Sequence, residues 1–143
     1  MESIFLTSPD IQKRIIASNE LAFAFPTNIP VVPGHLLICP KRVVQTVYEL
    51  TPGELAKIFE LLEQLKPALQ KTFGATGFNY AWNEGEEAGQ SMPHVHIHMV
   101  PRKKGDAGIT EYEPRKFLYR PGSREVSPEA ELIKVAELIK AAI

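Results

Sequence analysis

The strongest periodic pattern in the chain begins at Thr51 and predicts an amphipathic helix. Thr51, Pro52 and Glu54 form a start signal, because threonine and glutamate can make a reciprocal capping box and proline suits the first helical turn. Apolar side chains then recur every three or four residues and mark one buried face: Leu55, Ile58, Leu62, Leu65 and Leu69. Proline lacks a backbone donor, so Pro67 is expected to kink or interrupt this helix near its end.

Shorter apolar runs of a different period predict β-strands before and after this helix. Residues 13–18 and 20–25 indicate a hairpin whose turn contains Ser18 and Asn19. Residues 35–40 form a compact apolar run that ends at a proline, which is typical of a buried strand. Further along, aromatic residues alternate with smaller or polar ones, as in a half-buried strand: Phe78, Tyr80 and Trp82 with Asn79, Ala81 and Asn83.

Alternation is strictest in residues 93–101, PHVHIHMVP, which predict another strand. Successive side chains of a strand point to opposite faces. Two sets result: His94, His96 and His98 on one face, and Val95, Ile97 and Met99 on the other. We expect the apolar set to pack on a helix, which would leave a row of imidazoles on a surface or in a groove.

The end of the chain predicts a loop followed by a second helix. Residues 102–126 are charged and rich in turn formers, so we expect a long mobile loop rather than a second domain. Ser127 and Pro128 then start a predicted helix over residues 127–143. Its apolar face is Leu132, Val135, Ala136 and Ile139. The whole pattern predicts one α+β domain over residues 1–143 with a mainly antiparallel sheet.

Composition and charge exclude several classes of partner. The chain has 143 residues, of which 44% are hydrophobic, and a net charge of -1, so no overall field would recruit nucleic acid or an anionic membrane. No apolar run approaches the length of a membrane span, and the first residues lack the apolar core of a secretory signal. Cys39 is the single cysteine, which excludes an intrachain disulfide. We therefore expect a cytoplasmic protein without a nucleic-acid or membrane partner.

Three interpretations compete for the histidine row, which holds three of the four histidines in the chain. The first is a polar strand face that happens to consist of histidine. The second is a zinc site, but His94 and His98 would lie about 13 Å apart along one strand, which is an awkward ligand geometry. The third is an anion site, in which one imidazole is a nucleophile when neutral and its neighbours handle charge and protons.

The residues before the row favour the anion site. Gly89 permits close backbone approach, and exposed amide groups of its turn would cradle phosphate oxygens. Gln90 adds a side-chain donor without a negative charge, and Ser91 follows it. Such fixed donors stabilise a pentacoordinate phosphorus. Alone, this stretch would indicate an ordinary turn; beside three in-phase histidines it predicts a phosphate site.

With these motifs the chain resembles the histidine triad superfamily, whose signature is His-x-His-x-His followed by apolar residues. The similarity extends over PVVPGHLLICPKR (30–42), the connector 83–90 and GQSMPHVHIHMVPRKKGD (89–106), and it points to the fragile histidine triad branch of dinucleoside polyphosphate hydrolases. The resemblance implies a HIT-like fold. This fold has a five-stranded, mainly antiparallel sheet, a main helix and a C-terminal helix, and its sheet continues across a homodimer.

The resemblance also implies a catalytic role for each histidine. His96 would attack the α-phosphorus and form a covalent nucleotidyl-histidine, from which water releases a nucleoside monophosphate. The backbone carbonyl of His94 would fix the tautomer of His96. His98 would donate to phosphate oxygens and assist the leaving group, and His35 would belong to a supporting network with His94. No metal ligand is implied.

Substrate contacts follow from the same resemblance. Three residues would contact phosphate or bridging oxygens: Asn83, Gln90 and the amide of Ser91. Many relatives bind ribose through an Asp or Asn at the position of Thr27, so we assign the ribose to Thr27 and Asn28 together. Phe5 and Phe25 would line the base pocket, although an aromatic near a strand end is more often core.

The implied activity is hydrolysis or nucleotidyl transfer at the α-phosphate of a dinucleoside polyphosphate. A nucleoside phosphoramidate or an adenylyl sulfate is an alternative substrate, because the triad chemistry is indifferent to the leaving group. A nucleotide-binding signalling module with slow turnover is an alternative of a different class. No tightly bound cofactor is expected, and a Mg²⁺ ion would arrive with the substrate.

Overall fold

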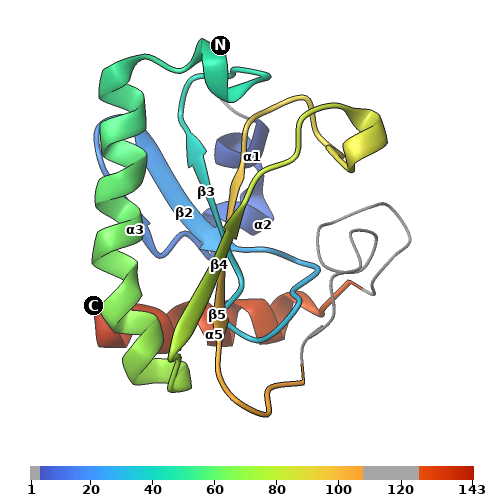
Figure 1. The fold of residues 1–143 in the computed structure, drawn as a ribbon. Helices are drawn as coiled ribbons and strands as arrows, with labels where there is room; N and C mark the ends of the chain where they lie inside the picture. Colours follow the sequence, from blue (N-terminus) through green and yellow to red (C-terminus); the bar gives the residue numbers. More distant parts are fainter. Residues whose placement is uncertain (1–3, 108–125) are drawn as a thin grey trace.

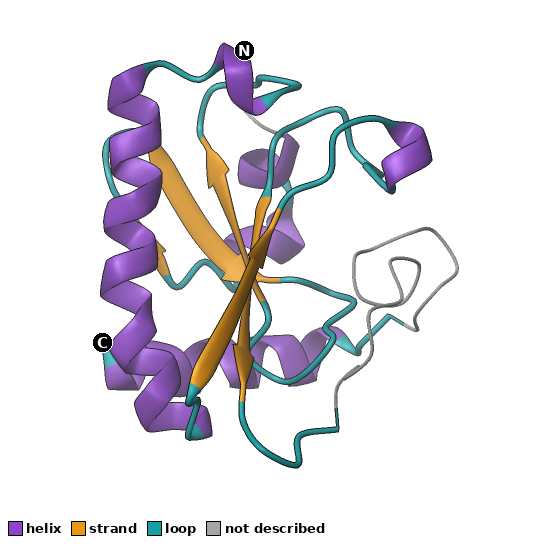
Figure 2. Cartoon of the chain, in the orientation of Figure 1, coloured by secondary structure: helices purple, strands orange, loops and turns teal. Residues whose placement is uncertain are grey.

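The computed structural model describes residues 4–107 and 126–143, and its elements are shown in Figure 1. In chain order they are α1 (Ile4–Thr7), α2 (Pro9–Gln12), β1 (Ala17–Ser18), β2 (Ala22–Pro26), β3 (Leu36–Pro40), the 3-10 turn η1 (Val47–Glu49), α3 (Pro52–Phe73), β4 (Gly77–Ala81), the 3-10 turn η2 (Glu86–Ala88), β5 (Ile97–Arg102) and α5 (Glu129–Ala142). Figure 2 shows the same chain by element type, with the long helix α3 along one side of the strands.

The strands form one five-stranded sheet in the order β1-β2-β3-β5-β4, and every neighbouring pair is antiparallel. This confirms the predicted α+β class and sheet. The predicted hairpin is present as β1 and β2, but its first strand is shorter than expected. The reason lies in α2, whose last turn continues to Arg14, where the backbone N–H donates to the carbonyl of Ile11 at 2.9 Å.

The two faces of the sheet carry different residues, as the strand register requires. Leu36 is opposite Met99 and Ile38 is opposite Ile97, and all four pack with α3 in the main core. Leu37 is opposite His98 and therefore points to the other face. There a second apolar cluster of Phe23, Phe25, Leu37 and Cys39 is covered by residues of α1 and α2 and the segment that follows them. The prediction that Val95, Ile97 and Met99 pack on a helix is confirmed.

Helix α3 begins with the predicted capping box, since Thr51 Oγ1 accepts from the N–H of Glu54 and the Glu54 side chain accepts from the N–H of Thr51. The expected interruption near residue 66 is wrong, because the helix continues through Pro67 to Phe73 and ends at Gly74 in the left-handed conformation; the alternative, a kink there, stays a prediction. Pro67 lies on the exposed side, where water can satisfy the carbonyl that loses its helical partner. Leu55 was expected on the buried face but is exposed; Leu61 takes such a position instead.

The C-terminal helix α5 starts at Glu129, two residues later than expected, and its first turn has no side-chain cap. Leu132, Ala136 and Ile139 are buried as predicted, and Val135 packs partly buried against the same core. Arg102, expected in a loop, ends β5 instead. The remainder of the loop predicted over 102–126 lies mostly outside the described residues. Within the described ranges, no helix combines the length and apolar character needed to cross a bilayer.

Candidate active site

The histidine segment enters β5 from a bend, so only His98 lies within the strand itself. His94 and His98 are each 2% exposed and His96 is 6% exposed. Of the two expected places for the imidazoles, an open surface is therefore wrong, whereas His96 and His98 line a cavity, in keeping with the expected groove. Their rings pack beneath residues of α1 and the β2–β3 connection, because the face of the sheet that holds His98 is covered rather than solvated.

His96 has its two ring nitrogens in different surroundings. Nδ1 lies 3.0 Å from the backbone carbonyl of His94. A carbonyl only accepts, so the neutral ring carries its proton on Nδ1 and keeps a lone pair on Nε2. Burial lowers the pKa of His96 from its ordinary value, and the bond to the His94 carbonyl opposes that shift. The ring is therefore held neutral and nucleophilic near pH 7.

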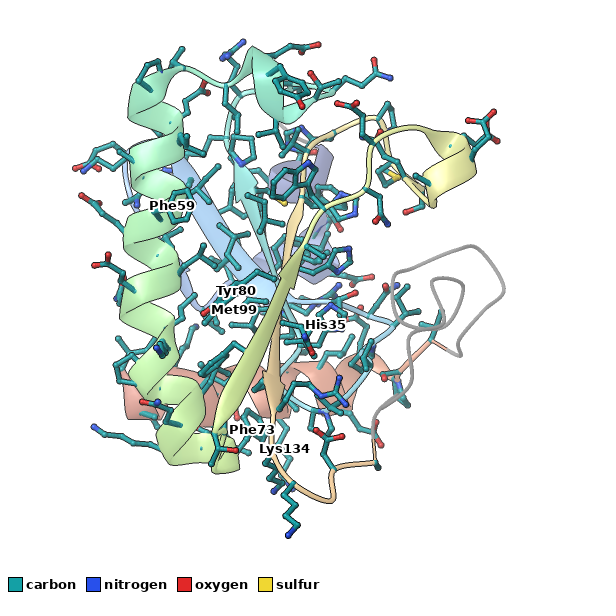
Figure 3. The ribbon with its side chains drawn as sticks, in the orientation of Figure 1. His35, Phe59, Phe73, Tyr80, Met99 and Lys134 are labelled. Carbon is teal, nitrogen blue, oxygen red and sulfur yellow. The ribbon has the colours of Figure 1, made fainter. Side chains whose placement is uncertain are left out.

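His35 contacts His98, whereas the sequence predicted a network with His94. Its Nε2 lies 2.8 Å from His98 Nδ1, and its Nδ1 accepts from the backbone N–H of Val31 at 3.0 Å. A backbone N–H only donates, so the neutral His35 ring carries its proton on Nε2. That N–H donates a hydrogen bond to His98 Nδ1. The proton of a neutral His98 ring is thereby placed on Nε2. Figure 3 labels His35 beside the β4–β5 pair, at the start of β3.

The side chain of His94 contacts the backbone of β3 and the ring of Phe5. Its Nε2 donates to the carbonyl of Pro40 at 3.2 Å, and its ring centroid is 5.7 Å from that of Phe5. Burial lowers the pKa of His94, partly offset by backbone carbonyls of Val44 and Pro40. His94 does not line the cavity described next, so it contributes its backbone carbonyl and its packing.

A cavity of about 340 Å³ opens onto His96 and His98. Its described lining is Phe5, Thr27, Asn28, Ile29, Leu37, Ser91, Met92, His96, His98 and Val126. The lining combines polar groups, among them Asn28, Ser91 and the two histidines, with apolar side chains that include Phe5, Ile29 and Leu37. Such a mixed lining suits an amphipathic ligand such as a nucleotide, whose phosphates and base differ in polarity.

Four lining residues escaped the sequence prediction: Ile29, Leu37, Met92 and Val126. Leu37 carried a usable signal, because it is two residues from His35 in the strand predicted over 35–40, and residues at that spacing share a face of a strand. Ile29 and Met92 are adjacent to predicted site residues. Val126 had no local signal, since it lies far along the chain from every other lining residue.

Asn83 and Gln90, predicted as phosphate contacts, do not line this cavity. Gln90 Oε1 accepts from the N–H of Gly85 at 2.9 Å, and its Nε2 donates to the carbonyl of Gln45 at 3.0 Å. Asn83 Nδ2 donates to the carbonyl of Gly89 at 3.3 Å. Both amides are thus used to fold the connector on itself and to attach it to the segment before η1.

Phe25, predicted to line the base pocket, is a core residue instead. It is 1% exposed, stacks on Phe23 with centroids 5.7 Å apart and lies 5.6 Å from Phe5. The alternative interpretation of an aromatic near a strand end was the correct one. Phe5 itself lines the cavity, so it separates Phe25 from the ligand space.

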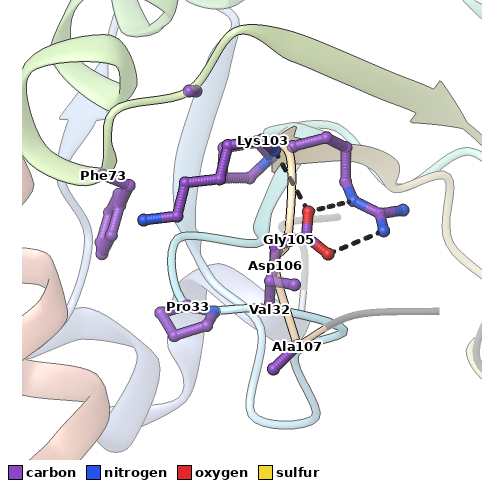
Figure 4. Close-up of a pocket in the computed structure, with 10 residues that line it drawn as sticks. Val32, Pro33, Phe73, Lys103, Gly105, Asp106 and Ala107 are labelled. Atoms are coloured by element: carbon purple, nitrogen blue, oxygen red, sulfur yellow. Dashed lines mark hydrogen bonds and ion pairs between the residues drawn. The ribbon is translucent and has the colours of Figure 1, made fainter. Parts of the chain in front are cut away.

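A second cavity, of about 250 Å³, lies away from the histidines between the β2–β3 connection and the end of β5 (Figure 4). Arg102 is bonded there to both carboxylate oxygens of Asp106 at 2.9 and 3.0 Å. This ion pair closes the turn after β5. No histidine is among the described residues that line this cavity.

Metal-ligating side chains are not gathered in the part of the chain that the structure describes. Across residues 4–107 and 126–143, no group of three or more His, Cys, Asp or Glu residues could hold a metal ion together. Cys39 is buried, and burial raises the pKa of its thiol well above the ordinary value, so it is a core residue and not a nucleophile.

Comparison with known proteins places this geometry in context. The HIT domain family matches residues 8–105. A bis(5'-adenosyl)-triphosphatase of Dictyostelium discoideum is 35% identical over 119 residues, which are 83% of this chain and 76% of that protein. A bifunctional bis(5'-adenosyl)-triphosphatase/adenylylsulfatase of Arabidopsis thaliana is 33% identical over 94 residues, 66% of this chain and 52% of that protein. The crystal structure of the Caenorhabditis elegans NitFhit protein superposes with a TM-score of 0.73 at 30% identity, covering 92% of this chain and 27% of that one.

Proposed function

Because this chain belongs to the HIT domain family, we propose that it hydrolyses a dinucleoside polyphosphate, or transfers its nucleotidyl group, at the α-phosphate. The D. discoideum relative is named for hydrolysis of such a substrate. The observation that carries the proposal is the state of His96. A buried, neutral imidazole with Nδ1 on the His94 carbonyl presents a lone pair on Nε2 at the wall of a cavity lined by both polar and apolar groups.

The first step forms a bond between His96 Nε2 and the α-phosphorus. The bond from that phosphorus to the bridging oxygen breaks, and the oxygen departs as an anion that accepts a hydrogen bond from His98 Nε2–H. The leaving nucleotide and a nucleotidyl-histidine result. In the second step water attacks the phosphorus and loses one proton to solvent, the electron pair of the phosphorus–nitrogen bond returns to His96 Nε2, and a nucleoside monophosphate is released. His35 keeps His98 in the tautomer that donates from Nε2.

The remaining lining residues divide the substrate between them. The backbone amide of Ser91 is proposed to bind phosphate oxygens. Thr27 and Asn28 are proposed to contact the ribose, and Phe5 the base. Asn83 and Gln90 act through the connector they fold. No tightly bound cofactor is part of this proposal; Mg²⁺ would enter with the polyphosphate and offset its charge.

Adenylyl sulfate is a second candidate substrate, favoured by the name of the A. thaliana relative, which includes adenylylsulfatase activity. It shares the adenylyl group with diadenosine triphosphate and differs only in the leaving group. Measuring kcat/KM for diadenosine triphosphate, adenylyl sulfate and an adenosine phosphoramidate separates these substrates, because kcat/KM ratios report differential binding of the transition states.

The decisive experiment is mass spectrometry of protein quenched soon after mixing with diadenosine triphosphate. Wild type is expected to gain the mass of one adenylyl group and to release AMP, whereas His96→Ala does neither. Leu138→Ala, on the exposed side of α5, serves as a matched control and should behave as wild type. Absence of both adduct and AMP in wild type contradicts the hydrolase; binding of AMP without turnover would instead favour a nucleotide-binding module. Activity lost to a chelator and restored by zinc would favour a metal-based reaction.

A homodimer is also proposed, formed through the outer edge of β4. Among the described residues this strand is at the end of the sheet. Tyr80 in the strand and Trp82 just after it are 48% and 53% exposed. A sheet edge with exposed aromatics is a suitable surface for pairing with a second copy. Analytical ultracentrifugation of wild type and Trp82→Glu tests this, with a dimer expected only for wild type. We propose the cytoplasm as its location, in keeping with the single buried cysteine.

A further inference from the structure

Val126 lines the cavity of His96 and His98, yet it comes from the segment that leads into α5. It is 66% exposed. An exposed valine alone needs no explanation. At the wall of a cavity, however, it presents apolar surface that a bound ligand would cover. Figure 1 shows this part of the chain entering α5 beside the connection between β2 and β3.

The backbone next to Val126 is hydrogen-bonded to another lining residue of the cavity. The N–H of Ser127 donates to the carbonyl of Asn28 at 2.7 Å. Asn28 lines the same cavity, and the N–H of its neighbour Thr27 donates to the carbonyl of His35 at 3.1 Å. Short backbone hydrogen bonds therefore connect the C-terminal segment to the proposed ribose contacts, and those contacts to His35.

An ion pair of Arg14 also joins the same two segments. Arg14 is 3% exposed, and its Nη1 donates to both carboxylate oxygens of Glu129 at 2.6 and 2.8 Å. Its Nε donates to the carbonyl of Pro26 at 3.0 Å, and its guanidinium lies 5.8 Å from the ring of Phe25. One buried side chain thus joins the first turn of α5 to the end of β2. Its two hydrogen-bond partners, Glu129 and Pro26, are close in the chain to Ser127 and Asn28.

The position of Val126 indicates which part of the ligand it would meet. The phosphate is proposed to bind at His96, His98 and the amide of Ser91. Through the Ser127–Asn28 bond, Val126 is held close to Asn28, a proposed contact of the ribose that carries the base. The lining of the same cavity also includes the apolar side chains of Ile29, Leu37 and Phe5. Aliphatic and aromatic groups cover the flat apolar faces of a nucleobase and give no attraction to a phosphate.

We infer that Val126 is a specificity-determining residue that contacts the base of the nucleoside whose α-phosphate is attacked. Arg14 and Glu129 are positioning residues, which hold Val126 in place through Ser127 and Asn28. This inference rests on the proposed function, because it names the part of the same site that receives the base. It gives the C-terminal segment a direct role in substrate choice.

The test measures dissociation constants of AMP and of ribose 5-phosphate by nuclear magnetic resonance titration, together with kcat and KM for diadenosine triphosphate. Val126→Ala is expected to raise the Kd of AMP and the KM about fivefold, while kcat and the Kd of ribose 5-phosphate stay within about twofold. Leu138→Ala removes a comparably exposed apolar side chain of α5 and should change none of these values.

Three results would overturn the assignment of Val126. In the first, Val126→Ala binds AMP as tightly as Leu138→Ala does. In the second, AMP and ribose 5-phosphate lose affinity equally, which would place Val126 away from the base. In the third, wild type binds no AMP, and the proposed function then fails as well. Wild type that binds AMP without hydrolysing the triphosphate contradicts only the hydrolase, and the Kd comparison still decides on Val126.

The positioning role is tested by a double-mutant cycle. Glu129→Ala is expected to raise the Kd of AMP about threefold with kcat unchanged, and Glu137→Ala on the same helix should have no effect. Because Glu129 acts through Val126, the double variant Val126→Ala/Glu129→Ala should bind AMP no more weakly than Val126→Ala alone. Additive losses would overturn the positioning role, whatever Glu129→Ala does to thermal stability.

Discussion

His35 determines which nitrogen of His98 carries the proton. Its Nε2 lies 2.8 Å from His98 Nδ1, while the N–H of Val31 occupies its own Nδ1 at 3.0 Å. The series of hydrogen bonds therefore runs from the N–H of Val31 to His35 and from His35 to His98. A backbone amide cannot change tautomer, so the direction of the relay is set by the fold of residues 31–35.

Replacing His35 should lower kcat more than it changes KM. In His35→Ala, His98 can place its proton on Nδ1, and the leaving oxygen then loses its donor. We expect kcat to fall about tenfold to a hundredfold, which corresponds to about 1.4–2.8 kcal/mol. His35→Gln can present an amide N–H to His98 Nδ1 and should recover part of the loss. Steady-state kinetics of the two variants checks this; an unchanged kcat in His35→Ala would contradict the relay.

The acid limb of activity should lie below the ordinary titration range of histidine. Burial lowers the pKa of His96, so the nucleophile stays neutral at pH values where an exposed imidazole is already protonated. The expected profile of kcat/KM falls only below about pH 6.5, the unperturbed histidine value. Diadenosine triphosphate is the suitable substrate, because it has no terminal phosphate that titrates in the same range. An acid limb above pH 7 would argue against a buried neutral nucleophile.

The same pKa shifts predict a stability change with the same direction. His94 and His96 both have lowered pKa values in the folded chain, so between the folded value and about pH 6.5 the unfolded chain binds more protons. The free energy of unfolding should therefore decrease as pH falls through that window and level off below the folded pKa. Urea denaturation of wild type and His96→Asn at several pH values measures this, with a smaller slope expected for the variant.

Gly34 is predicted to tolerate no side chain. Its φ is +92°, and a Cβ there would lie 2.7 and 2.8 Å from ring atoms of Phe73 and 3.0 Å from Pro101. We expect Gly34→Ala to lower the free energy of unfolding by about 3 kcal/mol, and to lower kcat because His35 is the next residue. The double variant Gly34→Ala/Phe73→Ala should lose less than the sum of its single variants.

Gly77→Ala provides the control for this substitution. It has no positive φ, and a Cβ at this position meets nothing within 4 Å. Thermal unfolding should therefore place Gly77→Ala near wild type and Gly34→Ala well below it. Equal effects at the two glycines would show that the approach of Phe73 to Gly34 is not what matters.

Gln90→Ala should affect stability more than catalysis. The substitution removes the bonds to the Gly85 N–H and the Gln45 carbonyl, which should lower the free energy of unfolding by about 1–2 kcal/mol. We expect kcat/KM to fall by no more than about threefold, since a direct donor to the transition state is worth about a hundredfold or more. Gln45→Ala leaves its backbone carbonyl in place and is the matched control. A hundredfold loss at normal stability would restore Gln90 as a phosphate ligand.

Local patterns predicted most of the sheet and the main helix. The capping box at Thr51, the apolar face from Ile58 to Leu69 and the alternation around His98 all depend on neighbours within a few residues. The expected interruption at Pro67 did not occur, because the energetic cost of a proline inside a helix depends on its exposure to water. A periodic pattern does not encode that exposure. The short helices α1 and α2 were missed for a related reason: each has four residues, too few to show a helical period.

The candidate site was predicted where the chain is locally continuous and missed where it is not. The triad and the Thr27–Asn28 pair are recognisable as short motifs. The role of Gln90 in the connector could not be predicted, because the sequence shows its hydrogen-bonding capacity but not its partner, the carbonyl of Gln45. His35 was assigned to the wrong histidine because strand register, not spacing, decides which ring it meets. Val126 could be placed only after the Ser127–Asn28 bond had been seen.

The Arg14–Glu129 pair has a consequence for the order in which the protein can mature on the ribosome. Synthesis delivers Arg14 and the residues around Asn28 early, whereas Ser127 and Glu129 follow about a hundred residues later. Until those residues leave the exit tunnel, the cavity lacks Val126 and the guanidinium of Arg14 lacks its ion pair with Glu129. A nascent chain with its histidines already translated would therefore bind nucleotide poorly, and acquisition of the complete pocket would coincide with docking of α5.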